Sequence, residues 1–199
     1  MASLKEITGL VTTGDIVLFS GRGFISRLLQ FCQWSRWSHV GMVVRLPQFH
    51  HPLLWEATSL DFKGDVLLDK PVKGVRLVEL GGAISSCSGR VTIRHLHGIN
   101  FNDMQHLALA DLQQKLSGLP YERSKRQLFK AWFDWFGRRN TEDLTSVFCS
   151  ELVAEAYQTL GLLDETKPSN EYVPADFSEK RGLMVKGGYL GPEIKVDSA

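Results

Sequence analysis

Short apolar runs separated by turn-forming residues predict β-strands in the first half of the chain. Residues 16–19 (IVLF) follow a Gly-Asp turn signal and have the length and composition of a buried strand. Residues 39–46 and 53–57 predict two further strands, and two prolines mark the loop between them. Because this loop is short, we expect the two strands to form an antiparallel pair. Residues 75–78 and 89–96 also predict strands.

Apolar residues at helical spacing predict helices, mostly in the second half of the chain. One helix is expected to begin near residues 102–103 and to run to residue 116, since Asn and Asp cap helix N-termini well. Others are expected over 122–136 and from 146 to Gly161, and an earlier helical pattern covers 24–32. The glycine-containing stretch 81–86 has the composition of a loop.

This order of elements, strands before helices, favours an α+β domain. We expect helices to pack on one side of an antiparallel sheet or partial barrel. The 199 residues are enough for one sizeable core, so a single domain over residues 1–199 is expected. Hydrophobic residues make up 43% of the chain and charged residues 23%, as in an ordinary folded domain.

Charge and cysteine content narrow the classes of partner and compartment. A formal net charge of +1 gives no overall attraction for nucleic acid, so no nucleic-acid partner is expected. Three cysteines fit neither a disulfide framework nor a zinc ribbon, which favours a reducing compartment. The first residues lack the apolar stretch of an export signal, and no segment has the roughly 18 consecutive apolar residues of a membrane span. We therefore expect a cytoplasmic protein.

One cysteine stands where nucleophilic chemistry is favoured. Cys149 lies in the run 146–157, which predicts the first turns of a helix. There, the unpaired backbone N–H groups and the positive end of the helix dipole favour a thiolate, the nucleophilic form of cysteine. Taken alone, a cysteine in such a position is more often a small packed hydrophobe.

A base and an orienting acid are available on the predicted strand pair. His39 begins one strand, and antiparallel pairing can bring Glu56, on the next strand, close to it. An imidazole can take the thiol proton, and a carboxylate can hold the imidazole in the required tautomer. A triad of Cys149, His39 and Glu56 therefore predicts a thiol hydrolase.

Four motifs in a fixed order carry a resemblance to a known family. They are residues 14–19 (GDIVLF), 37–43 (WSHVGMV), 55–57 (WEA) and 148–153 (FCSELV), and 118–121 (GLPY) and 172–177 (YVPADF) add to them. The chain resembles the circularly permuted papain-like thiol hydrolases. These form the permuted branch of the NlpC superfamily, which includes YiiX- and YaeF-like proteins and has lecithin–retinol acyltransferase as a relative. The histidine motif precedes the cysteine motif here, which is the permuted order.

The resemblance implies a permuted papain-like fold over most of the chain, with Cys149, His39 and Glu56 as its catalytic residues. It also implies that Tyr121 lines the active site, where its hydroxyl would donate to a developing oxyanion. A buried tyrosine satisfied by the backbone is the alternative for Tyr121. Ser38 and Ser150, which adjoin the base and the nucleophile, are further candidates for substrate or oxyanion contacts.

The expected reaction is cleavage of an amide bond, in a peptide or an N-acyl amino acid or lipid, through an acyl-thioester. Two alternatives stay open. One is transfer of the acyl group to an amine or alcohol, as in lecithin–retinol acyltransferase. The other is a catalytically idle membrane- or ligand-binding module on the same fold. The partner is thus expected to be a small-molecule, peptide or lipid-like acyl substrate, and no cofactor is expected.

Two other patterns bear on partners. Residues 123–139 are basic and aromatic, which suits either a helix in peripheral contact with a membrane or a helix packed on the core. His95 and His97 share one face of a predicted strand, as two metal ligands can. No carboxylate or cysteine spacing completes a site around them, so no metal is expected. Cys32 and Cys87 are expected to pack as ordinary residues.

Overall fold

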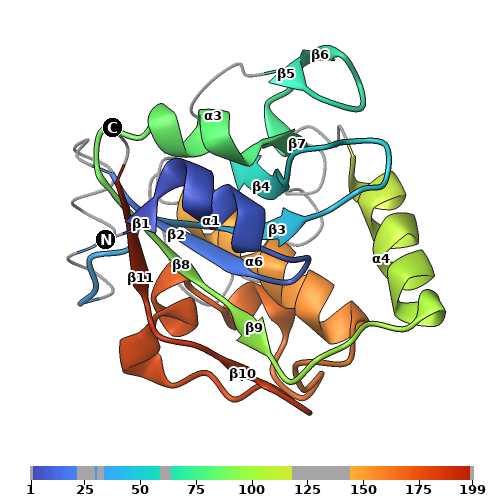
Figure 1. Cartoon of the computed structure of the whole chain (residues 1–199). Coiled ribbons are helices and arrows are strands. Elements are labelled where there is room, and N and C mark those ends of the chain that lie inside the picture. The colour runs from blue at the N-terminus through green and yellow to red at the C-terminus, as the bar shows by residue number, and fades with distance from the viewer. Residues whose placement is uncertain (1, 22–29, 31–33, 59–63, 118–143, 198–199) are drawn as a thin grey trace.

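Within the part of the chain that the structure describes, a seven-stranded sheet forms the centre of the molecule (Figure 1). The computed structural model describes residues 2–21, 30, 34–58, 64–117 and 144–197. The strand order is β1 (Ala2–Ser3), β11 (Ile194–Asp197), β8 (Arg90–Arg94), β2 (Ile16–Ser20), β3 (His39–Val44), β4 (Leu53–Thr58) and β7 (Gly74–Glu79). Neighbours are antiparallel, except that β1 and β11 run parallel. The fold is therefore α+β, as the sequence indicates.

The strands lie where the apolar runs predict them, except that one predicted strand is divided into two. β2, β3, β4 and β7 cover four of the runs, and β3 pairs with β4 in the expected antiparallel sense. The run 89–96 forms two strands, β8 and β9 (Leu96–His97), and β9 pairs with β10 (Tyr189–Leu190) outside the main sheet. The division falls at His95, whose Nδ1 lies 2.7 Å from Oδ2 of the buried Asp15. A further small ribbon pairs β5 (Gly64–Asp65) with β6 (Lys70–Pro71).

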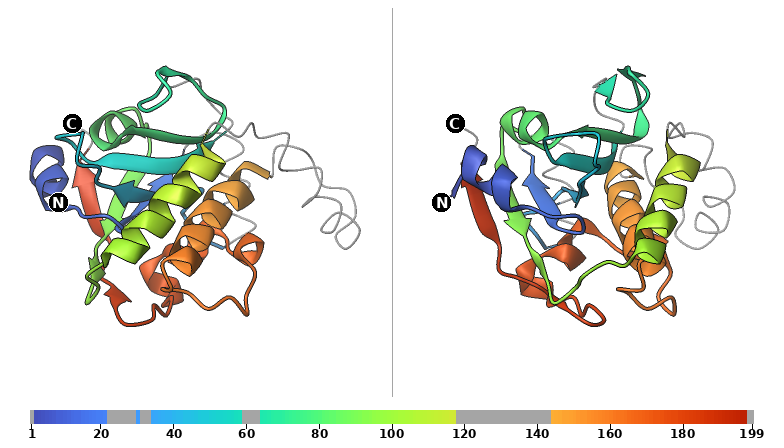
Figure 2. Two further views of the ribbon diagram at one scale, coloured as in Figure 1. Left: turned by 90° about the vertical axis from the view of Figure 1, so that its right-hand side faces the viewer. Right: turned by 45° about the vertical axis from the view of Figure 1, so that its right-hand side comes forward.

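Helices cover both faces of the sheet (Figure 2). One face packs against α4 (Asp103–Leu116) and α6 (Leu144–Thr159), in a core that includes Met42, Trp55 and Tyr157. The opposite face packs against α1 (Leu4–Leu10) and α3 (Leu80–Ser85), in a core that includes Val43 and Leu54. The expectation of helices on one side only was therefore wrong, because the pattern did not reveal the two short helices.

α3 occupies the stretch that the sequence analysis assigned to a loop. Gly81 and Gly82 lower its intrinsic helix propensity. Leu80, Ala83 and Ile84 nevertheless recur at helical spacing and are buried in the core on that face of the sheet. Burial of this apolar stripe outweighs weak propensity, since tertiary packing supplies most of the stability of a helix in a protein.

The two long helices of the described chain follow the sequence signals. Asn102 accepts from the backbone N–H of Gln105, whose side chain accepts from the backbone N–H of Asn102, and this capping box starts α4. α6 is followed by Gly161, whose φ of +74° suits glycine at a helix end. The chain then forms three 3₁₀ helices, η1 (Ser169–Glu171), η2 (Pro174–Phe177) and η3 (Glu179–Arg181). It returns to the sheet as β11, a strand that the sequence analysis missed.

Other expectations fall on parts that the structure does not describe. The helix expected over 122–136 lies outside the described residues, and so does the pattern at 24–32 apart from Gln30. Among the helices that are described, none is both long and apolar enough to cross a bilayer.

Candidate active site

His39 is the first residue of β3, so the sheet fixes its backbone while its ring lies at a strand end. It pairs with Phe19 of β2, and the two rings pack with their centroids 5.5 Å apart. The His39 side chain keeps 21% of its surface exposed. The imidazole is thus held on one side and open on another.

Glu56 lies in the middle of β4, where all six residues are buried. Because Met42 pairs with Trp55, the following residue, Glu56, lies beside the beginning of β3. Its Oε2 is 2.8 Å from Nε2 of His39. The strand pairing expected from the sequence therefore brings the two side chains into hydrogen-bonding contact.

Gly41 allows the two strands that carry these side chains to lie so close together. A Cβ atom at this position would lie 2.7 Å from Cδ1 of Leu54 and 3.1 Å from the carbonyl oxygen of Trp55. Any larger residue at 41 would force the strands or the Leu54 side chain to shift. The glycine in the histidine motif therefore has a packing role.

Arg76, on β7, lies behind Glu56. The strand register places the two residues opposite one another. The guanidinium donates from Nε, at 3.0 Å, and from Nη2, at 2.8 Å, to Oε1 of Glu56, which leaves Oε2 for His39. Sequence reasoning missed Arg76. The available signal was an arginine inside an apolar strand, because a buried guanidinium requires an anionic partner.

These contacts shift the pKa of both His39 and Glu56. Burial by itself lowers the pKa of His39, but the charge and hydrogen bond of Cys149, followed by those of Glu56, raise it from 6.5 to about 10. Burial by itself raises the pKa of Glu56, but the hydrogen bond and charge of His39, followed by those of Arg76, lower it from 4.5 to about 2. At neutral pH the pair is therefore an imidazolium beside a carboxylate.

Cys149 lies on α6, and its side chain is fully buried. It forms a side-chain hydrogen bond with His39. Because Nε2 of His39 is used by Glu56, Nδ1 is the ring nitrogen left for the sulfur. The helix begins at Leu144, so Cys149 lies in its second turn and not, as expected, in the first. The imidazolium, rather than the unpaired N–H groups of the helix end, is thus the positive group that contacts the sulfur.

Ser38 and Ser150 adjoin the site in sequence, and both hydroxyl groups contact the backbone. Ser38 Oγ accepts from the N–H of Gly21 at 3.0 Å, which ties the end of β2 to the start of β3. Ser150 Oγ donates to the carbonyl oxygen of Tyr172 at 2.6 Å and ties α6 to the segment that follows η1. These bonds give both serines a structural role. Tyr121, the third proposed substrate or oxyanion residue, lies outside the described residues.

The remaining sequence candidates lie apart from this site or beyond the described chain. Residues 123–139 and Cys32 are outside it, while Cys87 is partly buried and its Sγ accepts from the N–H of Gly89. The rings of His95 and His97 lie 6.2 Å apart, and His97 packs on Tyr189. Over the described ranges, no group of three histidine, cysteine, aspartate or glutamate side chains is arranged to hold a metal ion.

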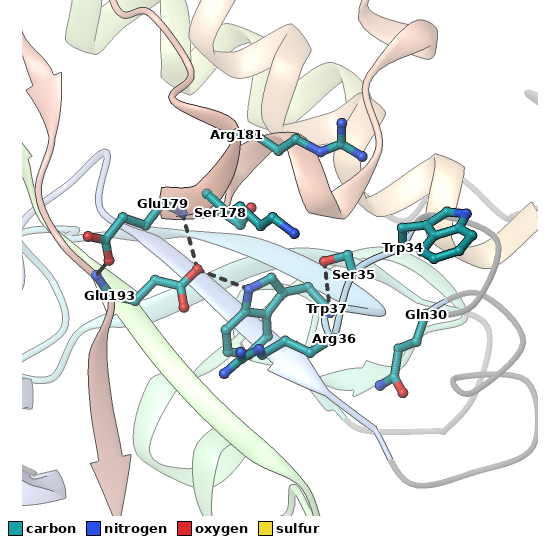
Figure 3. A pocket seen from close by; sticks show the side chains of 10 residues that line it. Gln30, Trp34, Ser35, Arg36, Trp37, Ser178, Glu179, Arg181 and Glu193 are labelled. Carbon is teal, nitrogen blue, oxygen red and sulfur yellow. Dashed lines mark hydrogen bonds between the residues drawn. The ribbon is translucent and has the colours of Figure 1, made fainter.

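A cavity of about 1020 Å³ lies beside the segment that leads into β3 (Figure 3). Its walls are residues 34–37 and 178–181, with Gln30 and Glu193. Glu193 joins the two walls, because its Oε1 accepts from Nε1 of Trp37 at 3.0 Å and from the N–H of Glu179 at 3.1 Å. Ligand pockets commonly measure about 300–1,000 Å³. The cavity is therefore large enough for a small molecule or a short peptide.

Comparison with known proteins finds a similarity in structure but none in sequence family. No family model matches the chain, and no curated protein matches it in sequence. A solved structure, the metalloprotein YiiX from Escherichia coli O157:H7, is similar with a TM-score of 0.51 and 22% sequence identity, over 94% of this chain and 97% of that chain. At this identity the match shows a shared fold alone. It is consistent with the YiiX-like branch that the motifs resemble.

Proposed function

We propose that this chain is a cysteine hydrolase that cleaves an amide bond, in a peptide or an N-acyl amino acid or lipid, through an acyl-thioester on Cys149. One observation carries the proposal: His39 contacts both Glu56, at 2.8 Å, and the thiol group of Cys149. A sulfur, an imidazole and a carboxylate in contact in this order suit nucleophilic catalysis by a thiol.

In the first half of the proposed reaction, the Cys149 thiolate attacks the carbonyl carbon and a C–S bond forms. The carbonyl π electrons move to oxygen and then return as the C–N bond breaks. The leaving amine takes the proton from Nδ1 of His39, which becomes neutral. Glu56 keeps the ring in place through Nε2, so that the proton is delivered from the nitrogen that faces the sulfur.

In the second half, neutral His39 accepts a proton from water as the water oxygen attacks the thioester. The C–S bond breaks, the carboxylic acid leaves, and the thiolate and imidazolium are restored. The balance is one amide and one water consumed, and one acid and one amine formed. An amine or alcohol in place of water would give the acyltransferase reaction, which shares every step up to the thioester.

The chain order supports a permuted papain-like fold. The strand that begins at His39 precedes the helix that carries Cys149, and this order is the permuted one. The likeness to YiiX supports the YiiX-like branch of that family. YiiX is described as a metalloprotein, but in the proposed mechanism Glu56 binds no metal. Its two oxygens accept from Arg76 and His39, which already place positive charge beside it.

The test is to trap the proposed thioester. The chain is mixed with p-nitrophenyl acetate near pH 7, the reaction is stopped with acid, and the acetylated peptides are identified by mass spectrometry. We expect acetyl groups on Cys149 and a rate about 10²–10⁴-fold lower in the His39→Asn variant, because general acid–base catalysis is lost.

The control is Cys87→Ala, which removes the other described cysteine and should leave the rate unchanged. Acetylation of Cys149 at the same rate with and without the His39 imidazole would contradict the proposal. So would acetyl groups that appear on Cys87 and not on Cys149. Circular dichroism of each variant separates loss of folding from loss of chemistry.

A further inference from the structure

Two imidazoles that the proposed reaction does not use lie side by side where β8 ends and β9 begins (Figure 1). They belong to His95 and His97, and their ring centroids are 6.2 Å apart. Asp15, which contacts His95, directly precedes β2, whereas His39 pairs with Phe19 near the other end of that strand. From residue 15 to residue 19 a strand extends roughly 13 Å, so this pair is distinct from the candidate active site.

Asp15 determines which nitrogen of His95 is left to bind a ligand. Its carboxylate is fully buried, and Oδ2 lies 2.7 Å from Nδ1 of His95. The carboxylate also accepts from the backbone N–H groups of Thr12 and Leu96, which fix its position. Since a carboxylate accepts, Nδ1 donates and Nε2 keeps the lone pair of the neutral ring. Histidines that bind metals usually donate their other ring nitrogen to a carboxylate or a carbonyl in this way.

Gly191 leaves room for the ring of His97 beside His95. Tyr189 of β10 pairs with His97 of β9, and two residues later the N–H of Gly191 donates to the carbonyl oxygen of His95 at 2.8 Å. Gly191 is thus the residue across from His95. A Cβ atom at Gly191 would lie 2.9 Å from Nε2 of His97. Because residues opposite one another across a strand pair share a face, this nitrogen lies on the side toward which His95 projects.

The spacing and exposure of the two rings suit one shared ion. Zn²⁺ binds imidazole nitrogens at about 2.0–2.1 Å, which places two rings on one ion with their centres roughly 5–6 Å apart. A small rotation of the exposed His97 brings the pair into this range. The His95 side chain is 19% exposed. Because its Nδ1 faces a buried carboxylate, we expect this exposed surface on the opposite edge of the ring, which contains Nε2.

The surrounding groups indicate the kind of ion. Asp15 places a carboxylate behind His95, and Arg94 directs its guanidinium to three backbone carbonyl oxygens. Over the described ranges, no third histidine, cysteine or carboxylate ligand joins the two rings, so water would complete the coordination. Imidazole suits Zn²⁺, Cu²⁺ and Ni²⁺, whereas Mg²⁺ and Ca²⁺ prefer oxygen ligands.

We propose that His95 and His97 bind one divalent transition-metal ion such as Zn²⁺, through Nε2 of each ring. Asp15 is the residue that orients His95. Binding is reversible and the fold does not require the ion, because two protein ligands replace the four of a structural zinc site and the bond between Asp15 and His95 forms without a metal. The proposal does not depend on the proposed hydrolase function.

Binding is measured by calorimetry with zinc chloride, in the Cys149→Ala protein so that the thiolate beside His39 does not compete for the ion. We expect a saturable site for Zn²⁺ and none for Mg²⁺. NMR of the imidazole nitrogens identifies the ligands. The Nε2 resonances of His95 and His97 should shift on addition of Zn²⁺, and those of His106, an exposed histidine on α4, should not.

Two substitutions remove the binding nitrogens and keep the structural contacts. In His95→Asn the side-chain amide nitrogen takes the place of Nδ1, so the bond to Asp15 is retained while Nε2 is lost. In His97→Phe the ring still packs on Tyr189, at the centroid distance of 5.0 Å, but has no nitrogen. Each should weaken Zn²⁺ binding at least 10-fold. His106→Phe is the matched control and should bind as the parent does, because that ring packs on Phe101 instead.

Three results would overturn the proposal: no saturable binding of Zn²⁺, an unchanged affinity in His97→Phe, or an equal loss in His106→Phe. Thermal unfolding of each variant shows whether the fold is kept. If His95→Asn does not fold, the exposed position of His97 keeps the test available. Each of these results can occur while Cys149 is still acetylated in the wild-type chain, so failure of the metal site and failure of the proposed reaction are distinguishable.

Discussion

Arg76 donates two hydrogen bonds to one oxygen of Glu56, and neither side chain exposes more than 8% of its surface. The other oxygen of Glu56 faces His39. These three residues lie on β7, β4 and β3, which are adjacent strands of one sheet. Strand register, and not a loop, therefore sets the orientation of the imidazole, and sites on rigid elements hold their geometry better than sites on loops.

The first prediction concerns the buried ion pair. Arg76→Met leaves the Glu56 carboxylate buried beside an apolar chain and should lower the free energy of unfolding by about 3–5 kcal/mol. Urea denaturation measures this loss. The same substitution at Arg90, an exposed position on β8, should cost less than about 0.5 kcal/mol. Equal losses for the two variants would show that the Arg76–Glu56 pair is not a stabilising contact.

The second prediction concerns the titration of His39. Cys149→Ser removes the charge that contributes most to raising the pKa of His39, so this pKa should fall from about 10 toward 6.5. Ring-proton chemical shifts measured against pH report it, and Cys87→Ser is the control that should leave the curve unchanged. Because the pKa of His39 is higher in the folded than in the unfolded chain, its protonation stabilises the fold. This contribution is complete below pH 6.5 and is lost as the pH rises through about 10. The wild-type chain should therefore lose stability over that window, and Cys149→Ser should lose less.

The third prediction concerns Glu151, two residues after the cysteine on α6. Burial, and then the charge of Glu155, raise the pKa of Glu151 from 4.5 to about 7. Below pH 4.5 the carboxyl group is protonated in both the folded and the unfolded chain, so it does not change the free energy of unfolding. Between pH 4.5 and about 7 it ionises more readily in the unfolded chain, so it destabilises the fold increasingly. Glu151→Gln should therefore raise the free energy of unfolding by about 1–3 kcal/mol at pH 8 and leave it unchanged at pH 4. A gain of the same size at both pH values would assign the effect to packing instead of charge.

The fourth prediction separates two roles for Ser150. Its bond to the carbonyl oxygen of Tyr172 is buried, so Ser150→Ala should cost about 1–2 kcal/mol of stability in thermal or urea unfolding. Acetylation of Cys149 should continue at nearly the wild-type rate. Ser86→Ala, which removes a similar bond at an exposed position, should cost less. A rate reduced about 10²–10³-fold at unchanged stability would instead make Ser150 an oxyanion donor.

The sequence pattern predicted an element correctly where the signals that form it lie within a few neighbouring residues. β2, β3 and β4 are runs of apolar residues flanked by turn signals, and the antiparallel pairing of β3 with β4 follows from the short loop between them. The start of α4 at Asp103 was also predictable, because its N-cap Asn102 and the partner Gln105 are close together in sequence. α3 was not predicted, because it is stabilised by packing against the sheet and the helix propensities of its own residues are weak. β11 was missed for the same reason, since its pairing partner β8 lies about one hundred residues earlier.

The sequence by itself determined the α+β class, the strands that carry His39 and Glu56, and the helix that carries Cys149. Only the tertiary structure decided that these three side chains meet and that Arg76 lies behind them. It also decided that the hydroxyl groups of Ser38 and Ser150 bond to the backbone. The physical reason is the distance along the chain between the residues that interact. Apolar periodicity and capping act over a few residues, whereas a hydrogen bond between strands or across a helix–sheet contact depends on how distant segments pack.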